Sequence, residues 1–87
     1  MGAILQKELK EQLPVITAVW FLDGYIYVKF KNEKIIGTPI NWYHNLSKGT
    51  PEQLLKYELW NDGRWIHWEE LDEDLSSEGY LSIEKGQ

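Results

Sequence analysis

The stretch VITAVWFLDGYIYVKFK, residues 15–31, decides the fold of this chain. It is dominated by β-branched and aromatic residues, which favour β-strands. Asp23 and Gly24 divide it into two halves, and this dipeptide is typical of the two-residue turns whose twist matches that of paired strands. The sequence therefore predicts an antiparallel hairpin whose register is fixed by the turn, so that Trp20 faces Tyr27.

The two faces of this predicted hairpin differ in character. Alternation along the strands gives a core face made of Thr17, Val19, Phe21, Ile26, Val28 and Phe30. The opposite face then carries Ile16, Ala18, Trp20, Leu22, Tyr25, Tyr27, Lys29 and Lys31. A sheet face that meets only water is usually polar, whereas this one holds a cluster of large apolar side chains. We expect either the N-terminal segment of the chain or a partner, including a second copy, to cover it.

The whole chain, including this hairpin, is predicted to form one domain with two short extensions. Residues 1–13 carry an apolar stripe typical of an amphipathic helix, and Pro14 marks the end of that helix. Residues 14–83 are the predicted domain, and residues 84–87 are predicted to be a frayed tail. An 87-residue chain has enough residues for one core and too few for a second.

Further short elements are expected within this domain. Residues 35–38 are predicted to form a third strand, and residues 41–46 either an irregular segment or a single turn of helix. Residues 50–53, TPEQ, combine an N-cap threonine, a proline and a capping-box glutamine, which predicts a helix that continues to about residue 57. Residues 58–67 read as another hairpin around an Asn-Asp-Gly-Arg turn. The expected fold class is α+β, with one antiparallel sheet of four to five strands and short helices.

Composition and charge restrict the class of protein. The chain has no cysteine, which excludes disulfides and thiolate chemistry, and no apolar run reaches the ~18 residues of a membrane span. We therefore expect a cytoplasmic protein. The net charge of −5 argues against a broad nucleic-acid surface. Residues 58–78 hold eight acids and one base, Arg64, for a net charge of −7, so this segment is either a solvated surface or a docking surface for a basic partner.

Motifs that carry chemistry are sparse. The sequence holds no glycine-rich phosphate loop and no nucleophile-elbow serine, and we expect no catalytic residue, no cofactor and no enzymatic activity. His67 precedes a run of acids, and we expect it to be half-buried and hydrogen-bonded to one of them, with a raised pKa. A metal site with Asp72 and Asp74 is the lesser alternative, because the run Asp72-Glu73-Asp74 lacks the glycine and the spacing of a calcium loop. Those three acids are predicted either to anchor a loop or to form a recognition surface.

The chain resembles an uncharacterised bacterial family, the domain of unknown function 2442, most specifically in its second half. The residues that carry the resemblance are LKYELW at 55–60, followed by NDG, then IHW at 66–68, LDEDL at 71–75 and EGYL at 78–81. The resemblance covers roughly residues 14–81 and implies a small α+β domain. Members of this family often lie beside a gene for a second small protein, in an arrangement read as a toxin–antitoxin pair in which this domain is the antitoxin. Some relatives carry a helix-turn-helix and are labelled DNA-binding, an extension that this sequence does not show.

The expected function is therefore that of a small protein-binding module of antitoxin-like type, with a small basic protein or a second copy as its partner. The residues predicted to make the contact are Trp20, Leu22, Tyr25, Tyr27, Asp72, Glu73 and Asp74. The alternatives are a homo-oligomeric regulatory or scaffold domain that uses the apolar hairpin face, and a nucleic-acid binder that uses Lys29, Lys31 and Lys34. Neither a membrane nor nucleic acid is the expected partner.

Overall fold

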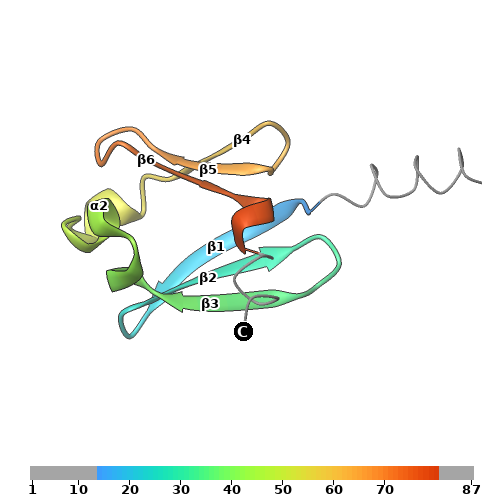
Figure 1. Ribbon diagram of the computed structural model, residues 1–87, viewed down its shortest axis with the longest axis horizontal. Coiled ribbons are helices and arrows are strands. Elements are labelled where there is room, and N and C mark those ends of the chain that lie inside the picture. Colours follow the sequence, from blue (N-terminus) through green and yellow to red (C-terminus); the bar gives the residue numbers. More distant parts are fainter. Residues whose placement is uncertain (1–13, 81–87) are drawn as a thin grey trace, which may run out of the picture.

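The computed structural model describes residues 14–80, which form a small α+β domain built on two facing three-stranded antiparallel sheets (Figure 1). The first sheet has the order β1 (Ile16–Leu22), β2 (Tyr25–Phe30), β3 (Ile35–Pro39), and the second has the order β4 (Glu58–Trp60), β5 (Trp65–Trp68), β6 (Glu73–Ser76). The predicted α+β class is confirmed, but the single sheet of four to five strands is replaced by two sheets. The predicted N-terminal helix, residues 1–13, and the tail, residues 84–87, lie outside the described residues.

The first hairpin has the predicted turn and register over most of its length. Trp20 pairs with Tyr27 and Val19 with Val28, and Asp23 adopts the left-handed φ of 51° that the turn requires. The prediction is wrong at the start of β1, where the register shifts at a β-bulge between Ile16 and Ala18.

The bulge exchanges the faces of two residues. Ile16 pairs with Phe30 and is buried, whereas Thr17 turns to solvent and its hydroxyl donates to the carbonyl of Lys29. The alternation predicted from the sequence has Thr17 on the core face and Ile16 on the outer face. An extra residue in one strand reverses the alternation beyond it, and the gain is the burial of an isoleucine in place of a threonine.

Three short helices connect the two sheets at one end of the domain: η1 (Ile40–Trp42), α2 (His44–Ser47) and α3 (Pro51–Leu54) (Figure 1). The predicted capping box is present in α3, because the Thr50 hydroxyl accepts from the Gln53 N–H and the Gln53 side chain accepts from the Thr50 N–H. The helix ends at Leu54, three residues before the predicted end. Leu54 is buried, and the chain then turns to begin β4. The capping box fixes where the helix begins, whereas tertiary packing determines where it ends.

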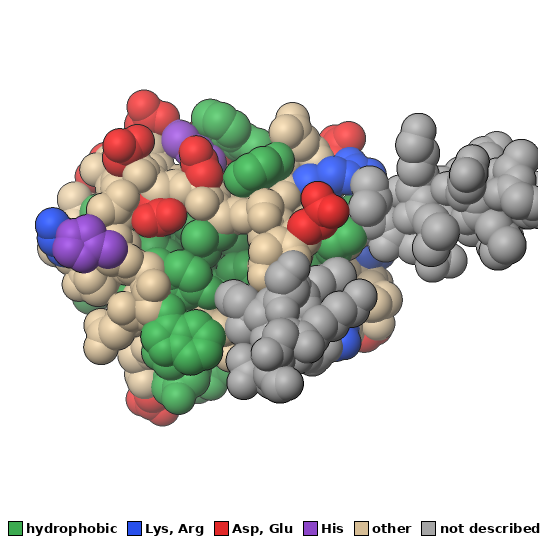
Figure 2. Space-filling view, viewed as in Figure 1, with side chains coloured by type: hydrophobic (Ala, Val, Ile, Leu, Met, Phe, Trp, Pro, Cys, Tyr) green, Lys and Arg blue, Asp and Glu red, His purple; other side chains and the backbone are tan. Residues whose placement is uncertain are grey.

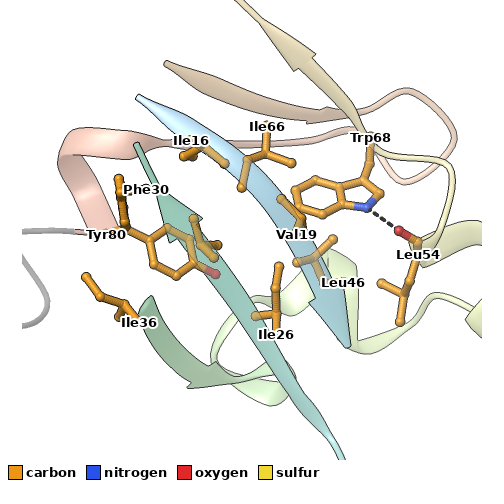
Figure 3. Close-up of a cluster of buried hydrophobic side chains, with 11 residues drawn as sticks. Ile16, Val19, Ile26, Phe30, Ile36, Leu46, Leu54, Ile66, Trp68 and Tyr80 are labelled. Atoms are coloured by element: carbon orange, nitrogen blue, oxygen red, sulfur yellow. Dashed lines mark hydrogen bonds between the residues drawn. The ribbon is translucent and has the colours of Figure 1, made fainter. Parts of the chain in front are cut away.

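The core lies between the two sheets (Figure 3). Its buried apolar side chains are Ile16, Val19, Ile26, Val28, Phe30, Ile36, Leu46, Leu54, Ile66, Trp68 and Tyr80. The Trp68 indole N–H donates to the Leu54 carbonyl at 3.0 Å, which satisfies the polar atom of the largest buried ring. Ile66 and Trp68 of β5 face β1 and β2, and burying them requires the second sheet to stack on the first rather than extend it.

One close backbone contact joins the two sheets beside Gly63. The Ile16 N–H donates to the Gly63 carbonyl at 2.7 Å, and Gly63 has a φ of +87°. A Cβ at this position would lie 2.5 Å from the Ile16 carbonyl oxygen. Only glycine fits both the left-handed backbone and the close approach, so the turn between β4 and β5 depends on this residue.

Candidate functional site

The outer face of the first sheet carries Trp20, Leu22, Tyr25 and Tyr27, hereafter the aromatic face. The Trp20 and Tyr27 rings stack with centroids 5.7 Å apart, and the Tyr25 and Tyr27 rings stack at 6.1 Å. Leu22 is 58% exposed and Tyr25 is 42% exposed. The structure therefore brings the four predicted residues together on one face of the sheet, where Leu22 and Tyr25 are exposed and Trp20 and Tyr27 are partly buried.

The third strand shapes the aromatic face in a way that the sequence analysis did not identify. Gly37 of β3 pairs with Tyr27, and a Cβ at position 37 would lie 2.5 Å from the Tyr27 Cε1 atom. The absence of a side chain lets the tyrosine ring lie over β3. Ile35, two residues earlier on the same face, is 50% exposed and extends the apolar area. The alternation of side chains along residues 35–37 is the sequence signal that could have placed Ile35 and Gly37 on the same face as Tyr27.

The acidic run lies on the other sheet. Asp72 occupies the turn before β6 with a φ of 52°, and its carbonyl accepts from the Asn45 side chain. Glu73 and Asp74 are the first two residues of β6. The outer faces of the two sheets point in opposite directions, because their inner faces share one core. The four residues of the aromatic face are therefore separate from the three acids. The acids themselves do not share one face, because Asp74 pairs with His67 on the outer side of the sheet and Glu73 pairs with Trp68, which faces the core.

His67 organises the outer face of the second sheet. Its Nδ1 lies 2.5 Å from the Asp74 carboxylate and its Nε2 lies 2.7 Å from the Glu69 carboxylate, while the Trp60 ring stacks on the imidazole at 3.9 Å. The hydrogen bond to Glu69, followed by that to Asp74, raises the pKa of His67. The predicted hydrogen bond between His67 and an acid is confirmed, but the histidine is buried rather than half-buried. His67 contacts residues of the other two strands of its sheet.

Several other acids of the −7 segment are also engaged within the domain. Glu70 forms an ion pair with Lys56 at 2.9 Å, and the hydrogen bond from Lys56 lowers the pKa of this carboxyl. The Glu58 carboxylate accepts the Trp60 indole N–H at 3.0 Å. Part of the acidity that the sequence places in residues 58–78 therefore holds side chains in position.

The described residues offer little support for a nucleic-acid site or a metal site. Lys29 pairs with Glu33 at 3.1 Å, which neutralises one of the three lysines considered for nucleic-acid binding. Within residues 14–80, no group of three or more histidine and acidic side chains is arranged to hold a metal ion.

One small pocket of about 80 Å³ is lined by Pro14, Arg64, Trp65, Ser76, Ser77 and Glu78. Pockets for small organic ligands usually occupy about 300–1,000 Å³. None of the helices in the described residues has the length and apolar character that a bilayer-spanning helix needs.

Comparison with known proteins identifies the family. The family model described as "Protein of unknown function (DUF2442)" matches residues 16–86. The chain belongs to this family. The predicted family resemblance is thereby confirmed, and the match includes both sheets of the DUF2442 domain described above.

Two solved structures share the DUF2442 fold of this chain. A protein of unknown function from Rhodospirillum rubrum is 24% identical, with a TM-score of 0.72 over 83% of this chain and 89% of the other. An uncharacterised protein from Chromobacterium violaceum is 23% identical, with a TM-score of 0.72 over 99% of this chain and 81% of the other. No curated protein matches the sequence. These similarities establish the fold alone.

Proposed function

We propose that this DUF2442 domain is a protein-binding module without enzymatic activity, and that it serves as the antitoxin-like member of a bacterial gene pair. The observation that carries the proposal is the aromatic face, a stacked set of rings, partly or fully exposed, on a sheet whose other side forms the core. The partner is a small basic protein encoded by the neighbouring gene, and the complex forms in the cytoplasm.

The aromatic side chains of this face can contribute strongly to the free energy of binding. Tryptophan and tyrosine are enriched among the residues that dominate protein interfaces, because they bury large areas at a low cost in side-chain entropy. Here the cost is lower still, since stacking between Trp20, Tyr27 and Tyr25 already restrains the rings. The aromatic face is therefore prepared for a partner before binding.

Charge supports a basic partner. The −7 segment holds further acids that do not bond His67, Lys56 or Trp60. Among them are Asp62 and Asp72, which are exposed, and Glu73, which is partly buried. Complementary charge accelerates encounter more than it strengthens the final complex. The family arrangement beside a second small gene supports the antitoxin-like role, in which binding alone neutralises the partner.

Co-expression with the neighbouring gene product tests this function. We expect the two proteins to co-purify and the domain to relieve any growth arrest that the neighbour causes alone. Tyr25→Ser should reduce both effects, whereas Leu55→Ser, which removes a 67% exposed leucine outside the aromatic face, should reduce neither. If the neighbour neither binds the domain nor affects growth, the antitoxin-like role is wrong.

Self-association is the second candidate for the same surface. The observation that favours it is the position of β3 at the edge of its sheet, with Ile35 exposed beside the aromatic face. A second copy could cover both features by a two-fold contact. Light scattering should then show a dimer for the wild type and a monomer for Trp20→Ser; a wild-type monomer at high concentration excludes this candidate.

A further inference from the structure

The outer face of the second sheet presents two exposed indoles that the core does not explain. Trp60 and Trp65 are directly paired across β4 and β5, so both project from the same side of the sheet. They are 46% and 41% exposed, whereas Ile66 and Trp68 on the inner side of β5 are buried. Figure 2 shows hydrophobic, histidine and acidic side chains side by side along the part of the molecule that the second sheet forms.

Carboxylates lie around Trp60 and His67 on the same face. Glu58 pairs across the strands with His67, and Asp74 pairs with His67 from the other side. Glu69 bonds the second nitrogen of the same imidazole. Arg64 lies beside Trp65 in the lining of the small pocket. The three carboxylates still outnumber the two cations when His67 is protonated, so these five groups keep a net negative charge.

The Trp60 ring is held in a fixed position. Its N–H is bonded to Glu58 at 3.0 Å and one side of the ring covers His67 at 3.9 Å. Trp65 lies beside it in the neighbouring strand without a stacking partner among residues 14–80. A fixed indole next to one without a stacking partner, with Glu58 at the border, is a surface to which a planar cation can bind.

We propose that this face, formed by Trp60 and Trp65 with Glu58 at its border, binds an arginine-bearing segment of the basic partner. A guanidinium stacks on indole and also donates to carboxylate, which satisfies both features of the surface at once. An anionic partner is repelled by the three carboxylates, and a purely apolar one would desolvate Glu58 without replacing its solvent contacts. The inference rests on the proposed function for the basic character of the partner, and it adds a second contact on the side opposite to the aromatic face.

The five tryptophans provide the test. In a proton–nitrogen NMR spectrum each indole N–H gives its own signal, and the probe is a short peptide with two arginines separated by glycine. We expect the signals of Trp60 and Trp65 to shift in a saturable manner. Trp20 reports on the aromatic face, buried Trp68 on the core, and exposed Trp42 on non-specific adhesion, and these three signals should stay in place.

Two comparisons control for charge. A peptide with glutamine in place of arginine should leave all five signals unchanged. Glu58→Gln keeps an acceptor for the Trp60 N–H while removing the charge, and it should weaken arginine-peptide binding at least threefold. Shifts at Trp60 and Trp65 no larger than those at Trp42, or equal binding of the glutamine peptide, would overturn the inference.

The failure of this inference and of the proposed function can be told apart. Peptide binding at Trp60 and Trp65 with no co-purifying neighbour would leave the cation-binding face intact and remove the antitoxin-like role. Conversely, a neighbour that co-purifies equally with wild type and with a Trp60→Ser, Trp65→Ser double variant would retain the function and remove this face from it.

Discussion

Replacement of Gly63 by alanine tests the joint between the two sheets. The new Cβ would lie 2.5 Å from the Ile16 carbonyl oxygen and 3.0 Å from a methyl carbon of Val15, so the turn and the start of β1 must separate. The left-handed backbone costs alanine about 1–2 kcal/mol. Loss of the bond from the Ile16 N–H, which lies in a buried residue, costs about 1–3 kcal/mol more. We therefore expect Gly63→Ala to lower the free energy of unfolding by about 2–5 kcal/mol.

Gly24→Ala is the matched control. Gly24 has a φ of +80°, close to that of Gly63, but a Cβ there meets no atom within 4 Å. It should therefore cost only the backbone contribution of about 1–2 kcal/mol. Urea denaturation of both variants gives the difference directly, and at about 4–8 °C per kcal/mol the melting temperatures should differ clearly. If the two variants agree within ~0.5 kcal/mol, a magnitude typical of a surface change, the joint at Gly63 does not stabilise the domain.

Three further predictions address separate elements. Thr50→Ala removes the acceptor for the Gln53 N–H and should cost about 1 kcal/mol in urea denaturation, a loss that Thr50→Ser should not reproduce. His67 has a raised pKa in the folded state, so its contribution to stability is complete below its unfolded pKa of 6.5 and is lost as pH rises through the folded pKa. The urea midpoint of the wild type should therefore fall over that pH range, whereas that of His67→Gln should not. Gly37→Ala should displace the Tyr27 ring and alter the tyrosine and tryptophan near-ultraviolet circular dichroism, and an unchanged spectrum would contradict the proposed packing of the ring over β3.

The local turn and cap chemistry of this chain could be predicted from sequence. Asp23-Gly24 defined the first hairpin, and its register placed the aromatic face correctly. Thr50 and Gln53 formed the capping box that their spacing indicated. These features depend on residues within a few positions of one another, so local physics suffices to place them.

Long-range packing determined what the sequence did not reveal. The bulge that buries Ile16 and exposes Thr17 forms at the strand end that lies against the Gly63 turn, 47 positions away in the chain. Whether β5 extends the first sheet or stacks on it depends on where Ile66 and Trp68 find apolar partners, and alternation within β5 is the same in both arrangements.

The candidate site was predictable to a similar degree. The four residues of the aromatic face were placed together because one hairpin carries them all. The acidic run was grouped with them by charge alone, and the structure places it on the opposite sheet, where Asp74 bonds His67. The exposed pair Trp60 and Trp65 was not among the predicted contact residues, although alternation in a strand at 65–68 puts Trp65 on the face opposite Ile66 and Trp68.

The most direct test of the account is the dissociation constant of the neighbouring gene product for three forms of the domain. Tyr25→Ser removes an exposed ring from the aromatic face, and Leu55→Ser removes an exposed leucine from another surface. The account predicts that Tyr25→Ser weakens binding at least tenfold, as expected for a residue that contributes strongly to an interface, while Leu55→Ser binds as the wild type does. Equal affinities for all three forms would show that the aromatic face is not the binding surface.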